Sequence, residues 1–565
     1  MRTILLIIAA CLPGAALACG GFFCNATPVD QQAERIIFVQ EDADTVTSYV
    51  EIAYQGEPEG FAWIVPVPSV PELDTWLGGS FNALDLATQP QWNFQNDCFF
   101  AEGDSAPQAA GGGDDGGVMV LDQQRVGPFD TVTLQSDDSR ELVEWLRVND
   151  YRVVPAMEPF IALYTAEGMK FLAMKLAPGE GTDSIQPIKM TYAATAPAVP
   201  LRLTSVAAQL EMGVKIWVLG DRRYGPRNVP DITVGDTEVV FDPNRWENNY
   251  LPLVARKIDA AGGHGFVTEM AAPTAPLAAT IRDSFVPERF GQEAIDARDA
   301  LVALLESKPY ITRLYSRVSP EEMDIDPIFH GVEGGDVSNI HNIPAPEGQE
   351  NLCGRGEEDG VNPCEFLACG AAGVCAEAVE PQNGNRAGCA CAPGSVARAG
   401  FSPDGRPMVS CGDARLNFTS TDGASSIQFP DICEGATFCG AEGECLMLNG
   451  FPACRCNAGY VSIPALDDQG MWTATCVAAK TPDSIDLAAI TIREPNLPYP
   501  GRVTPMTPMP TDQMPIDDNT MPPGERPMGL VTSGSNSGCA AMDHSRAPLW
   551  VLMGVFFLGL LRRRP

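Results

Sequence analysis

Histidine is scarce in this chain of 565 residues, which has four of them, at positions 264, 330, 341 and 544. The sequence also contains no H-E-x-x-H, G-x-S-x-G or Walker motif. These absences exclude the common zinc hydrolases, the serine hydrolases with a nucleophile elbow and the P-loop nucleotidases. A hydrolase that uses carboxylates is not excluded, because the chain has 73 Asp and Glu residues.

Basic residues are also few. The chain has 37 Lys and Arg residues, a formal net charge of -36 and an isoelectric point near 4.4. Nucleic acids and anionic membrane surfaces bind through basic patches, so both are excluded as partners. No cofactor is expected, since the chain has no motif that would hold one.

Long apolar runs are missing as well. A membrane span needs about 20 consecutive apolar residues, and the apolar runs of this chain are shorter than that. The amino terminus instead has one arginine, the short apolar stretch Ile4 to Ala10 and a small-residue triplet ending at Ala18. This order predicts a secretory signal peptide over residues 1–18, cleaved after Ala18. Cleavage there would make Cys19 the first residue, so a lipoprotein signal is the alternative. That signal normally has Leu at the place of Ala16.

The chain does contain two copies of a pattern of six cysteines with similar spacing. The intervening lengths are 4, 5, 13, 1 and 19 residues in the first copy and 5, 5, 8, 1 and 19 in the second. This repeat predicts two small disulfide-stapled modules, over residues 353–411 and 433–476, made in an oxidising compartment. The twelve cysteines are Cys364, Cys369, Cys375, Cys389, Cys391, Cys411, Cys433, Cys439, Cys445, Cys454, Cys456 and Cys476.

Each copy resembles the epidermal-growth-factor-like (EGF-like) module. Both copies have Cys-Gly-x-x-Gly-x-Cys at the second and third cysteines and Cys-x-Cys at the fourth and fifth. The spacing alone leaves the pairing open. The resemblance implies that the first cysteine pairs with the third, the second with the fourth and the fifth with the sixth. It does not imply calcium, because Asp431-Ile432-Cys433 lacks the acidic cluster of the calcium-binding modules.

Four further cysteines, Cys19, Cys24, Cys98 and Cys353, remain in the exported chain. A redox pair would have the C-x-x-C spacing, which these residues lack, so we expect structural bridges. One arrangement joins Cys19 to Cys24 and Cys98 to Cys353. Long-range pairs from the amino terminus are the alternative.

Residues 19–346 are expected to form an α+β head with mostly antiparallel strands. Strands are predicted at 36–39, 45–54, 61–68, 169–176 and 216–219, where apolar residues are continuous or alternate. Pro66 and Pro68 place the third of these at a strand end or sheet edge, because proline cannot donate to a ladder. Helices are predicted over 139–149, capped by Asp138, and over 293–307.

The head resembles a bacterial family known as domain of unknown function 2330. The resemblance rests on Cys-Gly-Gly-Phe-Phe-Cys at 19–24, Gln-Ala-Glu-Arg-Ile-Ile-Phe at 32–38, and Phe-Ala-Trp-Ile-Val-Pro-Val-Pro at 61–68. Glu-Trp-Leu at 144–146, running on to Asn-Asp-Tyr at 149–151, belongs to it too. We expect the match to extend from Cys19 to about residue 345. The family implies a domain and no established activity.

The carboxyl-terminal part is predicted to be a proline-rich linker over residues 480–537, an extended spacer. Residues 538–565 hold Cys539, an apolar helix at 547–561 and three terminal arginines. This arrangement resembles the myxobacterial sorting tag MYXO-CTERM, which implies cleavage and lipidation at Cys539 and transfer to the cell surface. A plain membrane anchor through the same helix is the alternative. The arginines place its end in the cytoplasm.

No catalytic residue and no metal site can be nominated from the sequence. His264 lies in a glycine-rich stretch, and His330 follows Asp324 and Asp326 without the spacing of a known metal site. The run Gly111 to Gly117 lacks the ligand pattern of a calcium loop. We therefore expect a non-catalytic, surface-anchored envelope protein that acts in adhesion, recognition or envelope structure. Its partners would be the membrane, through the tag, and a cell-surface or polysaccharide ligand. A surface hydrolase with a carboxylate-based site in the head is the alternative.

Overall fold

A computed structural model describes the backbone of most of the head and of the disulfide-rich region. The described residues are 31–52, 61–94, 119–149, 151, 153, 157–206, 208–242, 247–284, 291–343, 362–382, 385–401, 406–414, 433, 439–448, 451–466, 472–488 and 490. The predicted signal peptide, Cys19, Cys24, Cys98, Cys353 and the glycine-rich run at 111–117 lie outside them. So do Cys539, the helix at 547–561 and almost all of the linker.

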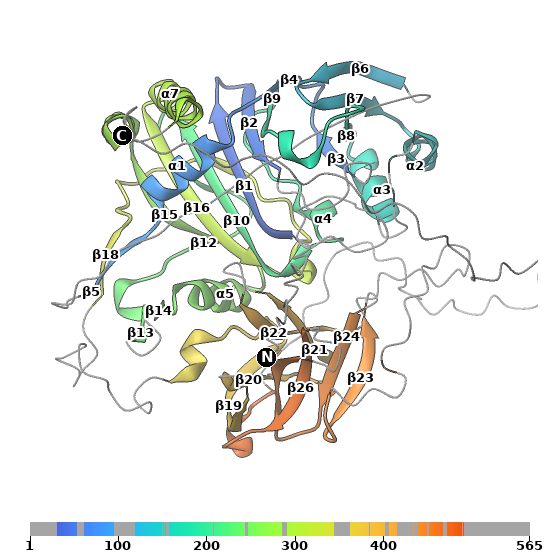
Figure 1. Cartoon of the computed structure of the whole chain (residues 1–565), viewed down its shortest axis with the longest axis vertical. Helices are drawn as coiled ribbons and strands as arrows, with labels where there is room; N and C mark the ends of the chain where they lie inside the picture. Colours follow the sequence, from blue (N-terminus) through green and yellow to red (C-terminus); the bar gives the residue numbers. More distant parts are fainter. Residues whose placement is uncertain are drawn as a thin grey trace, which may run out of the picture. The chain divides into compact units, whose positions relative to one another are not determined.

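An eight-stranded sheet forms the centre of the head (Figure 1). Across the sheet its strands are β12 (Asp231–Ile232), β15 (Phe266–Pro273), β16 (Tyr310–Val318), β10 (Ala208–Gly220), β1 (Gln31–Gln40), β2 (Thr45–Glu51), β9 (Ile188–Ala193) and β4 (Glu72–Thr75). Neighbouring strands are antiparallel except in the pairs β1–β10 and β12–β15. The strands expected at 36–39, 45–54 and 216–219 are confirmed as β1, β2 and part of β10.

A second, four-stranded antiparallel sheet packs against the first. Its order is β3 (Ala62–Val67), β8 (Lys170–Leu176), β7 (Phe129–Gln135) and β6 (Met119–Val126). The strand expected over 61–68 is therefore an edge strand, as its prolines predicted. Its residues alternate in direction: Trp63, Val65 and Val67 pack toward the large sheet, while Ala62 and Ile64 pack on the other side.

Helices cover the outer faces of both sheets, so the head has the layer order helix, sheet, sheet, helix (Figure 1). The large sheet is covered by α1 (Gly79–Thr88), α6 (Thr274–Ser284) and α7 (Gln292–Glu306). The small sheet is covered by α2 (Ser139–Val148) and α3 (Glu158–Ala166). Two further helices, α5 (Tyr250–Ala260) and the short α4 (Leu201–Thr204), pack on the inner side of the large sheet.

The sequence explains why the central strands are buried on both faces. In β1, Ile36 and Phe38 belong to the core between the sheets, whereas Ile37 and Val39 pack under the outer helices. A strand covered on both sides is apolar at consecutive positions. The helix expected over 139–149 is confirmed as α2, and the Asp138 carboxylate accepts a hydrogen bond from the Arg140 amide at its first turn.

Short elements complete the head and join its carboxyl-terminal end to the rest. The paired strands are β18 (Ile340–Ile343) with β5 (Gln91–Phe94), β11 (Tyr224–Pro226) with β17 (Phe329–Gly331), and β13 (Phe241–Asp242) with β14 (Glu247–Asn248). The 3-10 helices are η3 (Thr182–Ser184), η4 (Asp236–Glu238), η5 (Pro320–Glu322), η6 (Pro363–Phe366) and η7 (Pro482–Ser484). Because β17 and β18 pair with strands of the head, residues up to 343 belong to it.

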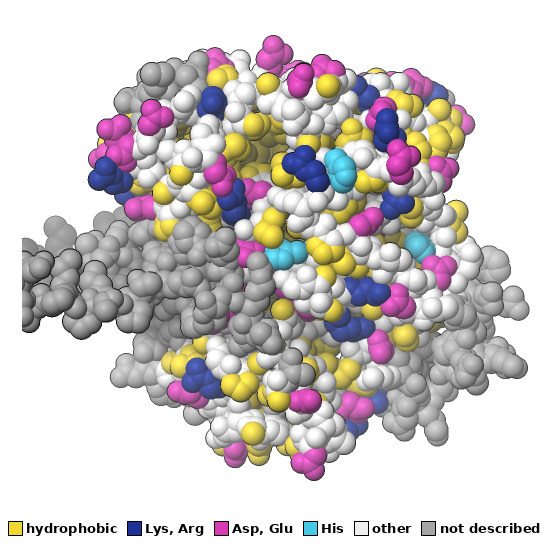
Figure 2. All heavy atoms as spheres, turned by 180° about the vertical axis from the view of Figure 1, so that it is seen from behind, with side chains coloured by type: hydrophobic (Ala, Val, Ile, Leu, Met, Phe, Trp, Pro, Cys, Tyr) yellow, Lys and Arg dark blue, Asp and Glu magenta, His cyan; other side chains and the backbone are white. Residues whose placement is uncertain are grey.

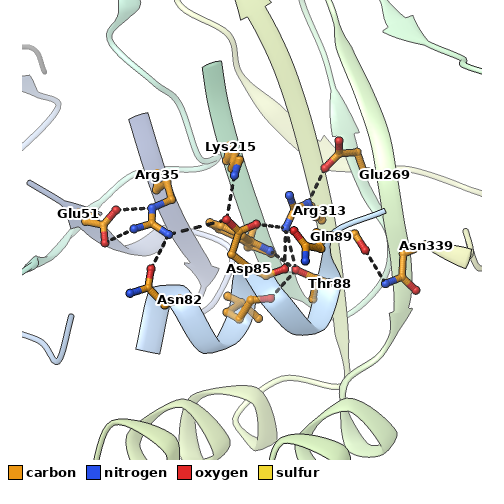
Figure 3. A network of polar contacts seen from close by, with 12 residues as sticks. Arg35, Glu51, Asn82, Asp85, Thr88, Gln89, Lys215, Glu269, Arg313 and Asn339 are labelled. Carbon is orange, nitrogen blue, oxygen red and sulfur yellow. Dashed lines mark hydrogen bonds and ion pairs between the residues drawn. The ribbon is translucent and has the colours of Figure 1, made fainter. Parts of the chain in front are cut away.

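A network of charged side chains holds α1 on the large sheet (Figure 3). The Arg313 guanidinium, 3% exposed, donates to Glu269 at 2.5 Å and to Asp85 of α1 at 2.6 Å. Lys215 reaches the same Asp85 at 2.8 Å. Burial alone would raise the pKa of Asp85, but Lys215 and Arg313 together hold that pKa below its ordinary value.

Glu269 owes its position to a β-bulge. In the ladder between β15 and β16, Thr268 pairs with Leu314 and Met270 pairs with Arg313, so Glu269 is the extra residue. A bulge re-aims the side chain that it inserts. Here the Glu269 carboxylate accepts hydrogen bonds from both Arg313 and the Tyr250 hydroxyl, the latter at 2.6 Å.

Among the described residues of the disulfide-rich region six bridges are present, and none of these six crosses between the two copies. The pairs are Cys364–Cys375, Cys369–Cys389, Cys391–Cys411, Cys433–Cys445, Cys439–Cys454 and Cys456–Cys476. This is the order, first to third, second to fourth and fifth to sixth, that the EGF-like resemblance implies.

The two copies nevertheless differ from separate modules, because they share both of their sheets. One sheet has the order β19 (Gly373–Gln382), β20 (Asn385–Cys391), β25 (Tyr460–Leu466), β26 (Trp472–Ala478). The other has the order β22 (Pro407–Asp413), β21 (Ser395–Phe401), β24 (Phe451–Cys456), β23 (Gly443–Leu448). The first hairpin of each copy thus pairs with the second hairpin of the other copy.

This exchange has an internal two-fold symmetry that can be followed in the sequence. Cys389 lies opposite Ser462 at one junction, and Cys454 lies opposite Ala397 at the other. Cys389 and Cys454 are the fourth cysteines of their copies, while Ala397 and Ser462 both lie six residues after the fifth cysteine. Modules this small bury little surface alone. The shared arrangement merges their cysteines into one core.

Three arginines connect this region to the head, and one of them, Arg406, pairs with Glu247 of β14. Arg256 of α5 donates to the carbonyl oxygens of Cys364, Glu365 and Leu367 and to the Glu365 carboxylate. Arg398 of β21 pairs with Glu321 of η5 at 2.5 Å.

We expect Arg313→Met to lower the free energy of unfolding by about 3–5 kcal/mol, because it leaves Glu269 and Asp85 buried without their shared cation. Urea unfolding of the two variants and the natural chain would measure this. The control is Arg140→Met: Arg140 is 89% exposed in its ion pair with Asp138, so the change should stay within about 0.5 kcal/mol. Equal losses in both variants would contradict the role given to Arg313.

We expect Gly388→Val to separate the two copies while all six bridges still form. A Cβ atom at Gly388 would lie 2.6 Å from the Ser462 carbonyl oxygen and 2.8 Å from Ile463 Cγ2, across the shared sheet. The expected loss is about 1–3 kcal/mol, measured by thermal unfolding, with non-reducing peptide mapping to check the bridges. Gly335→Val is the control, because a Cβ there meets no atom within 4 Å. An unchanged melting temperature would show that the copies do not depend on this junction.

Candidate functional site

A cavity of about 400 Å³ lies between the two sheets of the head. Its floor is the inner face of the large sheet, and its roof is β3 with the segment that leads into α4. The lining is mostly apolar and includes Ile36, Phe38, Val50, Trp63, Val65, Val67, Met190, Val199 and Leu203. Such a hollow is a usual place for a small ligand.

The outer surface offers no comparable apolar site among the described residues. Figure 2 shows hydrophobic, acidic and basic side chains interspersed over one face, with some hydrophobic ones recessed among polar neighbours. The large apolar side chains that are exposed, such as Leu86, Val148 and Ile340, come from separate elements of the head. Scattered apolar residues of this kind need no functional explanation.

Glu34 is the exception in the cavity lining. It occupies the same face of β1 as Ile36 and Phe38, where the alternation of the strand would place an apolar residue. Its Oε2 atom is buried and has no hydrogen-bond partner. Burial raises the pKa of Glu34 to about 7, and no charged neighbour contributes to this shift. The side chain is therefore an acid that is largely neutral below pH 7.

Tyr192 and Ser48 supply the other polar groups of the floor. Burial raises the pKa of Tyr192 to about 12, and the Ser48 hydroxyl oxygen is buried without a hydrogen-bond partner. Both side chains are hydroxyls that stay neutral over the physiological pH range. Together with protonated Glu34, the floor presents neutral O–H groups in an apolar surrounding.

The acidic group at the rim, Asp326, is held by other residues. Its carboxylate accepts hydrogen bonds from the Arg202 side chain at 2.8 Å, from the Arg202 amide at 3.0 Å and from the Tyr164 hydroxyl at 2.9 Å. Arg202 also pairs with Glu167 and lies over the Tyr164 ring. Asp326 therefore closes a network at the rim and is not available to act as a base.

A separate group of carboxyls lies near the contact with the disulfide-rich region. Burial raises the pKa of Glu322 of η5 to about 8. The neighbouring Glu211 carboxyl adds to this rise, while a hydrogen bond with Asp259 opposes it. The pKa values of Asp259 and Glu211 are also raised, first by burial. Glu211 has a positive φ of 56°, which is strained for a residue with a Cβ.

This group is packed closed. A Cβ at Gly263 would lie 2.5 Å from Glu322 Cγ, so the glycine with φ +79° lets the backbone lie against the acid. None of Glu211, Asp259 and Glu322 lines the apolar cavity. The apolar cavity has three carboxyls in its lining, but Glu51 is paired with Arg35 and Asp326 with Arg202, so a second carboxylate free to act beside Glu34, which a carboxylate hydrolase needs, is not found among its described lining residues.

The structure does not bring the sequence's metal candidates together. His264 Nε2 lies 2.7 Å from Asp324, Asp326 binds Arg202, and His330 lines a different, polar hollow of about 450 Å³ with Tyr224 and Lys308. His341 pairs with Asp236 at 2.8 Å and stacks on Trp92. Within the part of the chain that the structure describes, no three His, Cys, Asp or Glu side chains are placed to hold a metal ion.

The sequence contains no clear signal for Glu34. It lies in a polar stretch with Gln31, Gln32 and Arg35, ahead of the strand predicted at 36–39, although that stretch belongs to the part that resembles the bacterial family. Tyr192 and Ser48 have no signal either, because ordinary strands contain both residue types. Their position at the cavity follows from the strand order β1, β2, β9.

We expect Glu34→Gln to become more stable than the natural chain as pH rises. Below pH 4.5 both folded and unfolded chains hold the Glu34 proton; between 4.5 and about 7 only the folded chain does. The stability that the protonated acid contributes is therefore lost as pH rises through this interval. The difference between variant and natural chain should grow by about 3 kcal/mol from pH 4.5 to 8, measured by urea unfolding.

The control for this experiment is Glu333→Gln, since the Glu333 side chain is 98% exposed. Its stability difference should not change with pH. If the stability difference between Glu34→Gln and the natural chain were also independent of pH, Glu34 would be ionised and solvated in the folded protein.

One comparison with known proteins bears on the identity of the head. The family model described as "Uncharacterized protein conserved in bacteria (DUF2330)" matches residues 13–320, more than half of the chain. Neither a curated protein nor a solved structure matches. The match ends before β17 and β18, which the structure nonetheless pairs with strands of the head. The chain belongs to the bacterial DUF2330 family.

Proposed function

We propose that this protein is an exported, non-catalytic recognition protein whose head binds a small ligand in the cavity between its two sheets. The observation that carries the proposal is the lining of that cavity. It is mostly apolar, and of its carboxyls Glu51 is paired with Arg35, Asp326 is held by Arg202, and Glu34 has a buried oxygen without a partner. This composition serves binding and orientation.

The lining argues against the alternative, a surface hydrolase. Hydrolysis by carboxylates requires a general acid and a second carboxylate that acts as base or nucleophile, within reach of one substrate. Glu34 alone faces the cavity without a partner, and Asp326 at the rim is occupied by Arg202 and Tyr164. An apolar lining also favours a small apolar molecule over a polysaccharide. Nucleic acid stays excluded by the net charge of -36.

The remaining segments are proposed to hold the head outside the cell. Six disulfide bridges suit an oxidising compartment, and the region around them is proposed to consist of two EGF-like copies joined into one unit. Residues 1–18 would direct export, and residues 480–537 would form the spacer. Cys539 would be the point of processing and lipidation in a MYXO-CTERM tag, with 547–561 as its helix. Among the described residues no helix is long and apolar enough to cross a membrane.

The display and the binding can be tested in one experiment on intact cells. Limited protease digestion should cut the spacer and release the head with the disulfide-rich region, because proline-rich spacers are exposed and the bridged core is not. Solvent extraction of the released fragment followed by mass spectrometry should yield a bound small molecule. The Val65→Phe variant, whose larger side chain fills part of the cavity, should yield less of the bound molecule. The control is Val70→Phe, at a position that is 41% exposed, and it should yield as much as the natural chain.

Two separate outcomes would count against the proposal. Full protection in intact cells, with digestion only after lysis, would overturn surface display. A released fragment that carries no molecule, in the natural chain as in Val65→Phe, would overturn the binding function and leave display intact.

A further inference from the structure

The polar groups of the cavity lie at different places along its floor. In the ladder between β1 and β2, Ile36 pairs with Val50 and Phe38 with Ser48, so Glu34 lies beyond Ile36, at one end. Between β2 and β9, Val46 pairs with Tyr192. From the Glu34 end to the Tyr192 end the floor therefore runs along about six residues of β2, roughly 20 Å at 3.3 Å per residue.

The roof follows the same direction. Ser69, just after β3, accepts a hydrogen bond from the Ala193 amide at 2.9 Å, next to Tyr192. The Val67 end of β3 therefore covers the Tyr192 end of the floor. Trp63, at the other end of β3, lies toward Glu34. The cavity is thus an apolar slot with a carboxyl at one end and a hydroxyl pair toward the other.

The volume limits the size of the occupant. At roughly 30 Å³ for each heavy atom of a liquid, 400 Å³ holds about 13 such atoms. This is the size of one medium-length alkyl chain with a small head group, and it is too small for a two-chain lipid. Apolar residues line the slot between Glu34 and Tyr192, so the chain would lie along β1 and β2.

The charges around the slot disfavour a charged head group. In the part of the lining that the structure describes, Glu51 is paired with Arg35, Asp326 is paired with Arg202, and Arg227 is exposed to solvent. The raised pKa of Glu34 has burial as its cause, so no described cation compensates its charge. A carboxylate head would meet Glu34 with no compensating charge. An ammonium head group would exchange its water shell for a single carboxylate, that of Glu34, and burying such an ion pair is seldom favourable.

We propose that the slot binds a single-chain amphiphile with an uncharged head group whose oxygen accepts a hydrogen bond from the Glu34 carboxyl. This rests on the proposed function and names its ligand class. Alcohols, amides and esters of medium-chain acids carry such an oxygen. Because the acid is protonated up to about pH 7, it can serve as the donor.

The test uses the exported chain and four probes with the same ten-carbon tail: decan-1-ol, decanoate, decylammonium and decane. Binding is followed by intrinsic fluorescence, because Trp63 lines the slot, and Trp63→Phe identifies its part of the signal. At pH 6 decanol should bind at least about tenfold more tightly than decanoate or decylammonium, and more tightly than decane, as one additional hydrogen bond requires.

Two variants separate the head-group contact from the slot itself. Glu34→Leu should bind decane and decanol alike. Glu34→Gln keeps a hydrogen-bond donor, so it should retain the preference for decanol. In the natural chain the affinity for decanol should fall between pH 6 and 8, and in this variant it should stay constant. On the neighbouring strands Glu34 lies opposite the apolar Val214 of β10, and the nearest charged group on β2 is Glu51, which Arg35 holds. Tyr192 lies at the other end of the slot and stays neutral, so neither group competes in this interval.

The outcomes distinguish this inference from the function on which it rests. Equal affinity for all four probes would overturn the head-group assignment while leaving a binding cavity. Tightest binding of decylammonium would replace the neutral head by a cationic one and so overturn the inference. Binding of none of the probes would mean that Glu34 is satisfied by water alone, and both the inference and a cavity for apolar chains would fall.

Discussion

The position of Arg313 between two acids is the interaction on which the geometry of the head depends. Its guanidinium joins Glu269 on the bulge of β15 to Asp85 on α1, and it lies over the Trp217 ring (Figure 3). Lys215 and Arg35 approach the same Asp85 from the neighbouring strands. Breaking one partner of a buried group of charges is strongly unfavourable, so the helix and the four strands β15, β16, β10 and β1 keep one relative position. The face of β1 that carries Arg35 and Ile37 is thereby fixed, and with it the opposite face, where Glu34, Ile36 and Phe38 line the cavity.

Burial alone does not decide what a carboxyl does in this protein. Asp85 and Glu34 are both removed from water, yet the pKa of Asp85 is lowered and that of Glu34 is raised to about 7. The difference is the partner: Asp85 has Lys215 and Arg313, and Glu34 has none. A buried acid without a partner destabilises the fold whenever it is ionised, so its retention calls for a reason outside folding. Burial raises the pKa of Glu322 in the same way, but this side chain is packed against Gly263 and faces other acids, which leaves no room for a ligand.

The disulfide-rich region shows how two weak units can become one stable unit. Each copy closes three loops, and each bridge contributes a few kcal/mol by restricting the unfolded chain. Bridges alone do not bury surface. By pairing β20 with β25 and β21 with β24, the two copies place their cysteines in a common core and leave four strand edges fewer exposed. The nearly equal spacing of the cysteines in the two copies is therefore a requirement of the symmetry, since Ala397 and Ser462 must reach equivalent partners.

The parts of this structure that were predictable are those set by neighbours in sequence. Apolar continuity gave β1, Pro66 placed β3 at an edge, and Asp138 marked the start of α2. The cross-copy pairing was not predictable, because a strand can satisfy its hydrogen bonds equally well with either hairpin, and only the burial of the shared core selects one. The same reasoning applies to the cavity. Glu34 lies in a polar stretch ahead of Ile36 and does not stand out in the sequence, and Ser48 and Tyr192 line the same cavity only because β2 lies between β1 and β9. Long-range strand order therefore determines which chemistry the lining presents, and that order carries no local signal. A protein of this family whose strands matched but whose position 34 was apolar would keep the fold and lose the donor, which makes Glu34, rather than the architecture, the residue to examine for function.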